Sequence, residues 1–138
     1  METQGIPLDA FAGDWSLHRR ILDAQGSATL EGRVTFHAAP TGLRYREQGV
    51  LTLPTGTRVE AERTYFWERG SDGVTVRFDD GRPFHHMHPG ITTDVHHDCS
   101  PDRYSGRYDW TRWPQWRLVW DVSGPRKSYR SDSVYTRL

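Results

Sequence analysis

The sequence has a single cysteine, Cys99, among its 138 residues. One cysteine excludes an intrachain disulfide and fits a reducing compartment. No apolar run approaches the ~18 residues that a membrane-spanning helix needs. Residues 1–15 have neither the basic start nor the apolar stretch of a secretory signal. We therefore expect a cytoplasmic protein that does not enter a membrane.

An excess of charge is also lacking, because 18 Lys and Arg balance 18 Asp and Glu. Without a net positive field nucleic acid is not expected as a partner. We expect a small-molecule ligand instead and leave a homodimer open. Aliphatic residues are sparse, but six Trp and six Tyr supply the bulk of a core. The length fits one domain, residues 1–138.

Alternation with period two runs through most of the chain and indicates half-buried strands. Trp15, Leu17, Arg19 and Ile21, for example, share one face. The pattern recurs in about ten segments joined by short turns, and only residues 7–11 are expected to form a short helix. Because so many strands need protected edges, the sequence predicts an all-β, closed or nearly closed antiparallel up-and-down barrel. A two-sheet sandwich is the alternative.

The segment Gly13-Asp14-Trp15 resembles the Gly-x-Trp that begins the first strand of lipocalins and other calycins. In that superfamily the preceding helix closes one end of the barrel, and the Trp packs beneath a basic side chain of the last strand. The resemblance implies that Trp15 is buried at the closed end, in cation–π contact with Arg130 or Arg137.

Nearly the whole chain is similar to a bacterial family of lipocalin-like proteins with no assigned activity. The similarity lies in FDDGRPFH (residues 78–85), in HxC followed by DxY (residues 97–104), and in WxVxGPRKxYR (residues 120–130). A more distant similarity is to the nitrobindin-type ten-stranded barrel, which holds haem through a histidine, although no such motif matches here residue by residue. These resemblances imply the barrel and add no catalytic residue.

Three charged residues fall on the same strand faces as aromatic residues. They are Arg19, Glu47 and Arg63. A charge inside a protein is costly unless it is paired or hydrogen-bonded. The pattern therefore predicts either an internal ion-pair network or a wet cavity for a polar or anionic ligand, unless a β-bulge turns the charges outward.

Aromatic and histidine side chains supply the remaining candidates. Tyr104, Tyr108 and Trp110 either line a pocket that stacks a flat ligand or fill the core. Five of the seven histidines occur as HHMH and VHHDC, and the alternation points His86 and His97 into the barrel. If these two segments pair as strands, two or three imidazoles converge near Cys99. Imidazole and thiolate together are ligands that suit zinc or copper. Exposed or hydrogen-bonded histidines are the alternative, and no metal ligand is assigned.

The leading hypothesis is a module that binds a small planar or anionic molecule inside the barrel. Its predicted ligand-binding residues are Arg63, His86, His97, Tyr104, Tyr108, Arg19, Glu47 and Trp110. One alternative is an isomerase or hydrolase with His86, His88 or His97 as general base. Another is a haem- or metal-binding barrel that uses the His85–His97 cluster. No phosphate loop or nucleophile motif is present, so the sequence names neither a cofactor nor a catalytic residue.

Overall fold

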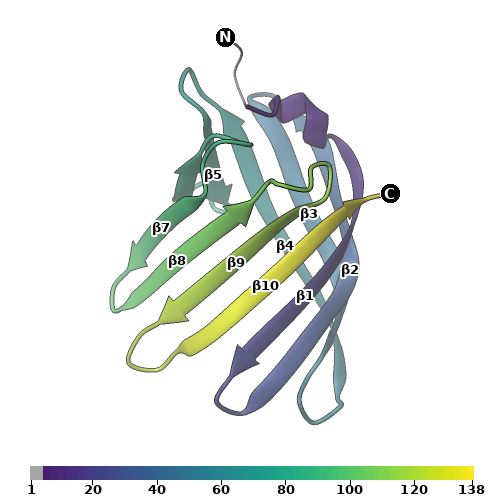
Figure 1. Cartoon of the computed structure of the whole chain (residues 1–138), viewed down its shortest axis with the longest axis vertical. Coiled ribbons are helices and arrows are strands. Elements are labelled where there is room, and N and C mark those ends of the chain that lie inside the picture. Colours follow the sequence, from purple (N-terminus) through teal and green to yellow (C-terminus); the bar gives the residue numbers. More distant parts are fainter. Residues whose placement is uncertain (1–4) are drawn as a thin grey trace.

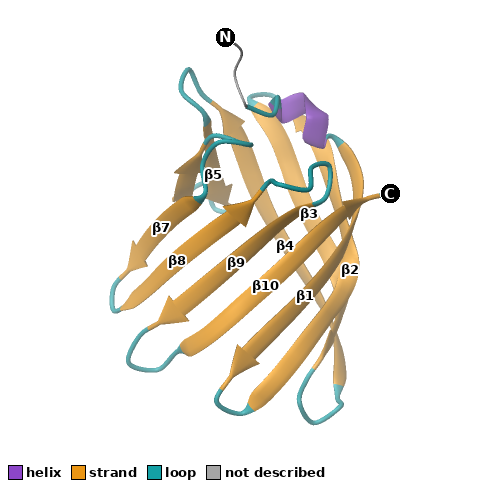
Figure 2. Cartoon of the chain, viewed as in Figure 1, coloured by secondary structure: helices purple, strands orange, loops and turns teal. Residues whose placement is uncertain are grey.

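Ten antiparallel strands and one short 3-10 helix, joined by turns, make up residues 5–138, the part of the chain that the computed structural model describes (Figures 1 and 2). The elements are η1 (Leu8–Phe11), β1 (Gly13–Asp23), β2 (Gly26–Ala39), β3 (Gly42–Thr52), β4 (Arg58–Arg69), β5 (Val74–Phe78), β6 (Pro83–Met87), β7 (Asp94–Cys99), β8 (Asp102–Asp109), β9 (Trp116–Ser123) and β10 (Ser128–Arg137). Residues 1–4, the start of the segment that lacks the features of a secretory signal, lie outside the described part.

The strands form one continuous sheet in the order β6-β5-β4-β3-β2-β1-β10-β9-β8-β7. Each strand pairs with its neighbour in sequence, except across the seam described below, and β1 also pairs with β10, so the first and last strands lie side by side. The prediction of a nearly closed up-and-down barrel is confirmed, and the single sheet rules out the sandwich. Among residues 5–138, no helix is long and apolar enough to cross a bilayer.

The barrel has one seam, between its edge strands β6 and β7, which share no backbone ladder among the described residues. Side chains close this seam instead. The Phe84 ring meets the His97 ring edge-on at a centroid distance of 5.2 Å, and His85 Nε2 lies 2.9 Å from the Tyr108 hydroxyl. The two histidine-bearing strands therefore do not pair, which removes the basis for histidines converging with Cys99.

The helix η1 lies across one end of the barrel (Figure 1), and a cluster of aromatic side chains packs beneath it and closes this end. Phe11 and Trp15 are fully buried, and Trp15 Nε1 donates a 2.8 Å hydrogen bond to the Phe11 carbonyl. The Arg137 guanidinium lies 4.0 Å from the Trp15 ring centroid and donates to the carbonyls of Ala12 and Ala10. The predicted cation–π contact is confirmed, and Arg137 rather than Arg130 makes it.

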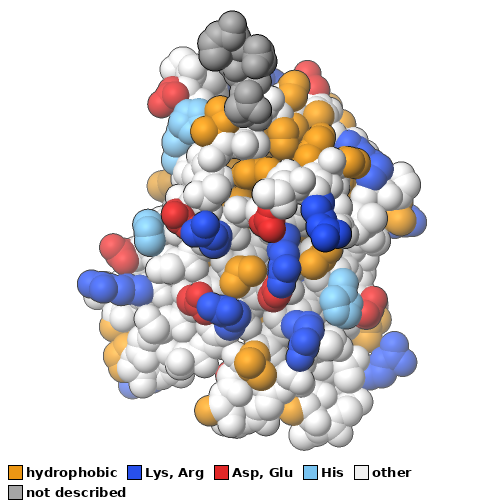
Figure 3. All heavy atoms as spheres, in the orientation of Figure 1, with side chains coloured by type: hydrophobic (Ala, Val, Ile, Leu, Met, Phe, Trp, Pro, Cys, Tyr) orange, Lys and Arg blue, Asp and Glu red, His pale blue; other side chains and the backbone are white. Residues whose placement is uncertain are grey.

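The outer wall of β8, β9 and β10 is covered by charges of both signs (Figure 3). Arg130 forms a bidentate pair with Asp121, and Arg117 forms one with Asp132. Exposed pairs of this kind contribute about 0–1 kcal/mol each. The face in Figure 3 therefore presents alternating charge rather than a patch of one sign.

Candidate ligand-binding cavity

A cavity of about 840 Å³ opens at the end of the barrel opposite η1. Its walls come from β1, β4, β8, β9 and β10 and from the β5–β6 turn, and the hairpins around this open end are visible at the bottom of Figure 1. A narrow extension of about 40 Å³ continues deeper. Ligand pockets commonly measure about 300–1,000 Å³, so the outer part has room for a small molecule.

A buried ion pair forms one wall of the deep part. Arg19 donates to both carboxylate oxygens of Glu47, at 2.7 and 2.9 Å, and its Nε donates to Ser133 Oγ at 2.7 Å. The two charged residues are only 7% and 2% exposed. The internal ion-pair network that the sequence predicted is therefore present, with the bidentate geometry that gives charge-assisted hydrogen bonds their strength.

Two tyrosines complete the hydrogen bonding of the Glu47 carboxylate. The Tyr45 hydroxyl donates to Glu47 at 2.6 Å and accepts from the Tyr135 hydroxyl at 3.0 Å. Burial alone opposes ionisation of Glu47, but the hydrogen bonds and charge of Arg19 outweigh it and hold the pKa of Glu47 below its ordinary value. Glu47 is thus ionised, and both of its carboxylate oxygens accept hydrogen bonds.

Arg63 on β4 differs from Arg19, because it forms no ion pair with any residue in the described range 5–138. Its closest polar contact is the Tyr65 hydroxyl, 3.4 Å from Nη1, and its guanidinium lies 6.0 Å from that ring's centroid. Arg63 lines both the wide and the narrow part of the cavity and stays solvent-exposed through the mouth. It is a cation available to a ligand at the point where the cavity narrows.

Flat aromatic faces flank this position. Phe84 stacks on Trp120 at a centroid distance of 5.0 Å and on Tyr65 at 5.7 Å. The Trp120 ring lies against Gly106 on the neighbouring strand, where a Cβ would come within 2.6 Å of it. Glycine at this position therefore lets the indole lie flat on the barrel wall.

His85 points inward because of a β-bulge in β6. The ladder between β5 and β6 shifts register after Val76, so Phe84 and His85 are both buried, although neighbours on a regular strand point to opposite faces. His85 Nδ1 has no hydrogen-bond partner within residues 5–138, and the same holds for Trp116 Nε1. Both residues line the narrow part of the cavity.

Burial lowers the pKa of His85 to about 3, and the neighbouring imidazole of His97 adds to this. Protonation therefore favours the unfolded chain between pH 3 and the ordinary value of 6.5. The stability that neutral His85 contributes is complete above pH 6.5 and is lost as the pH falls towards 3.

Replacing His85 with phenylalanine should remove this pH dependence. Urea denaturation of both proteins between pH 4 and 7 measures it. We expect the stability of the wild type relative to His85→Phe to fall on acidification, by up to about 3 kcal/mol at pH 4. A stability difference that stays constant across this range would contradict the assignment of a neutral, buried His85.

The predicted inward orientation of His86 is wrong. The bulge at Phe84 shifts the alternation by one residue, so His86 pairs with Thr75 and lies exposed on the outer face of β6. His88 also lies outside the barrel, near Asp72. The general-base hypothesis, which rested on three histidines, therefore retains only His97.

The other predicted residues divide into two groups. Arg19, Arg63, Tyr104 and Tyr108 line the cavity or its narrow extension. Glu47 lies behind Arg19, and His97 is on the inner face but packs against Phe78 and Phe84. Trp110 belongs to the closed end, where it stacks on Tyr108 and donates to the Thr92 carbonyl at 2.8 Å. The structure thus brings together about half of the predicted set.

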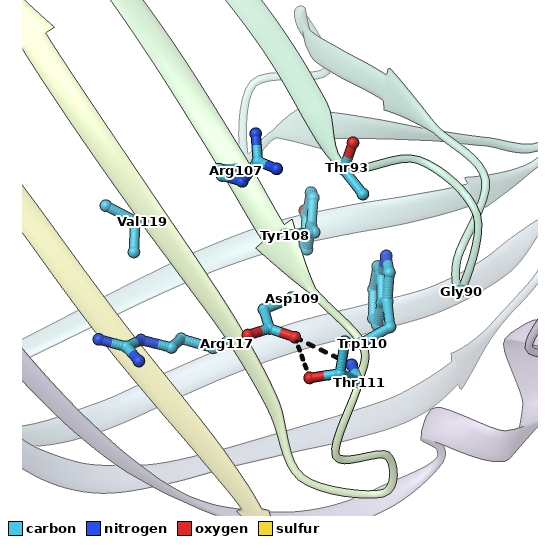
Figure 4. Close-up of a pocket in the computed structure, with 9 residues that line it drawn as sticks. All are labelled: Gly90, Thr93, Arg107, Tyr108, Asp109, Trp110, Thr111, Arg117 and Val119. Carbon is cyan, nitrogen blue, oxygen red and sulfur yellow. Dashed lines mark hydrogen bonds between the residues drawn. The ribbon is translucent and has the colours of Figure 1, made fainter.

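A second hollow, of about 540 Å³, lies on the outer side of β8 and β9 (Figure 4). Its charged groups are already engaged: Arg107 pairs with Asp94 at 2.8 Å, Arg117 pairs with Asp132, and the Asp109 carboxylate accepts from Thr111. Within residues 5–138, this hollow has no unpaired charge comparable to Arg63, so the inner cavity is the better candidate site.

A comparison with a solved structure supports the barrel fold. The S-type phycobiliprotein lyase CPES from Guillardia theta aligns with a TM-score of 0.65 at 9% identity, over 95% of this chain and 90% of that one. A de novo designed fluorescence-activating β-barrel aligns with a TM-score of 0.47 at 18% identity, over 95% of this chain and 96% of the design. At 9% identity, the match to the lyase shows the fold alone. No curated protein matches the sequence. Residues 11–137 match the family of unknown function DUF6314, and the chain therefore belongs to this family.

Proposed function

We propose that this protein binds a small, planar, anionic molecule in the open cavity of its calycin-like barrel. The observation that carries the proposal is Arg63, a cation without an ion-pair partner in residues 5–138, on the inner wall of a cavity of about 840 Å³. An arginine in this position favours a carboxylate, sulfonate or phosphate group, because its guanidinium matches such groups with two parallel donors.

The surrounding charges favour Arg63 as the anchor over the other cations of the cavity. Arg19 is committed to Glu47 at 2.7 Å, and Arg82 at the rim pairs with Asp80 at 2.7 Å. A ligand anion at either of those positions would compete with a carboxylate already in place. Arg63 has no ion-pair partner among residues 5–138: its cross-strand neighbour Glu47 is hydrogen-bonded to Arg19, and its own contact is the weak 3.4 Å one to Tyr65.

The aromatic walls favour a flat ligand over an aliphatic chain. Tyr65, Trp120 and Tyr104 line the wide part of the cavity next to Arg63. Aromatic faces attract other π-systems in offset or edge-on arrangements, in addition to the area that they bury. A planar ring system with one anionic substituent could stack on the aromatic walls and pair with the Arg63 guanidinium.

Binding of the fluorescent probe 8-anilinonaphthalene-1-sulfonate tests the proposal. Arg63→Ala should weaken it by about five- to tenfold, because a charge-assisted hydrogen bond is lost at a site that water can reach. The neutral probe N-phenyl-1-naphthylamine has the same ring system without the sulfonate, and its affinity should change little.

Arg44→Ala is the matched control, since Arg44 is an exposed arginine on the outer face of β3. It should leave the affinities of both probes unchanged. Arg63 would be refuted as the anchor if Arg63→Ala lost as much affinity for the neutral probe as for the anionic one. It would also be refuted if Arg44→Ala lost as much affinity for the anionic probe as Arg63→Ala does.

A further inference from the structure

Three side chains with metal-ligating atoms meet on the outer surface, at the end of the barrel that carries η1. They are Asp72 in the turn between β4 and β5, and His86 and His88 at the end of β6. Each offers one ligand atom, and these atoms all lie within 4.8 Å of one another. Residues two apart on an extended segment point the same way, which explains why both imidazoles face the turn.

The two imidazoles are oriented by threonine hydroxyls. His86 Nδ1 lies 3.2 Å from Thr75 Oγ1, and His88 Nδ1 lies 3.5 Å from Thr92 Oγ1. The Nε2 atoms face the turn, where His88 Nε2 donates a hydrogen bond to Asp72 Oδ1 at 2.8 Å, and a bound ion would take the place of that proton. Metal-binding histidines typically have their second ring nitrogen held by such a hydrogen bond, which fixes the tautomer and presents a bare nitrogen to the ion.

Gly73 makes the approach of the two rings feasible. Its φ of +79° disfavours other residues. A Cβ there would lie 3.0 Å from His86 Nε2 and 3.1 Å from His88 Cδ2. The missing side chain therefore leaves the space beside Asp72 in which both rings sit.

We propose that Asp72, His86 and His88 form a surface site for a divalent transition-metal ion of the zinc type. Two imidazole nitrogens and one carboxylate oxygen are ligands that zinc accepts at about 2.0–2.2 Å, with water in the fourth position. Tetrahedral coordination would place the ligand atoms about 3.3 Å apart. Small rotations of exposed side chains achieve this, because the Asp72 side chain is 87% exposed and that of His88 39%.

The ion would connect the β4–β5 turn to the edge strand β6. It would replace the His88–Asp72 hydrogen bond with a three-point link and add a constraint next to the seam of the barrel. The nitrogen-rich donor set selects zinc, copper or nickel over magnesium and calcium, which prefer oxygen ligands. This site is independent of the ligand cavity, which opens at the other end of the barrel.

Zinc titration of the untagged, chelator-treated protein, in competition with the coloured chelator 4-(2-pyridylazo)resorcinol, tests the site. We expect one Zn²⁺ per chain. His86→Ala, His88→Ala and Asp72→Asn should each weaken binding by about tenfold or more, since even the loss of a hydrogen bond behind a ligand costs about 10–100-fold. Addition of Co²⁺ should produce visible d–d bands that the same three variants lose.

His96→Ala is the matched control, because His96 is an exposed histidine on the outer face of β7, with Nδ1 3.4 Å from Ser105 Oγ. It should bind zinc like the wild type. Far-UV circular dichroism of each variant checks that the barrel is intact. No measurable zinc binding, or zinc binding that His96→Ala weakens as much as His86→Ala does, would overturn the proposal.

Discussion

Replacing Trp15 with alanine should lower the free energy of unfolding by about 3–5 kcal/mol, the range for large-to-small aromatic substitutions in cores. Trp15 is fully buried and packs against Phe11, Trp113 and Trp116. Its removal would also leave the Arg137 guanidinium without the ring that lies 4.0 Å away. Urea denaturation at pH 7 measures the loss.

Two further variants separate packing from the hydrogen bond of Trp15. Trp15→Phe keeps most of the ring but loses the 2.8 Å bond to the Phe11 carbonyl, so its cost should be clearly smaller. Leu22→Ala is the surface control, because Leu22 is 55% exposed, and it should cost no more than about 0.5 kcal/mol. An unchanged stability of Trp15→Ala would mean that the closed end contributes little to folding.

Glu47→Ala should also lower the free energy of unfolding by about 3–5 kcal/mol, because it leaves the buried Arg19 guanidinium without its counter-charge. The same substitution removes the acceptor of the Tyr45 hydroxyl. Glu62→Ala is the matched control, since Glu62 belongs to an exposed pair with Arg46 at 3.5 Å, and it should cost less than about 1 kcal/mol.

Removing both charges should lower the free energy of unfolding much less than removing one. In Arg19→Met/Glu47→Leu no buried charge is left unpaired, and apolar replacements of buried ion pairs are often neutral. Urea denaturation of Arg19→Met, Glu47→Leu and the double variant measures the coupling energy. Additive losses in the double variant would contradict a direct, buried Arg19–Glu47 pair.

The fold follows from the sequence because alternation is a local property that each strand repeats. The inward orientation of Trp15, Arg19, Glu47 and Arg63 could be predicted in this way, since their strands pair in register along their whole length. The seam between β6 and β7 could not be predicted. Whether two short strands pair depends on the curvature of the whole sheet, and the alternation of residues along a single strand does not indicate this curvature.

The error at His86 has a specific cause. One extra residue in the bulge at Phe84 exchanges the inner and outer positions after it, so His85 enters the cavity and His86 leaves it. The sequence contains a weak sign of this irregularity, because Pro83 cannot donate a ladder hydrogen bond and is typical of strand starts and bulges. The shift reverses the orientation of both histidines.

The clustering of Asp72, His86 and His88 could not be predicted from the sequence for a different reason. Asp72 lies in a turn, where Asp is common because of its backbone preferences, so its presence there does not indicate a ligand. Its place beside His88 depends on the β4–β5 turn reaching the end of β6, 16 residues further along the chain. Only the arrangement of three strands in space shows this proximity.

A crystal structure of the protein with bound 8-anilinonaphthalene-1-sulfonate tests the proposed ligand cavity most directly. The proposal predicts the naphthalene ring in the wide part of the barrel against Tyr65 and Trp120, with a sulfonate oxygen about 3 Å from the Arg63 guanidinium. A probe bound on the outer wall instead, such as in the hollow beside Arg107 and Arg117, with only water inside the barrel, would contradict it.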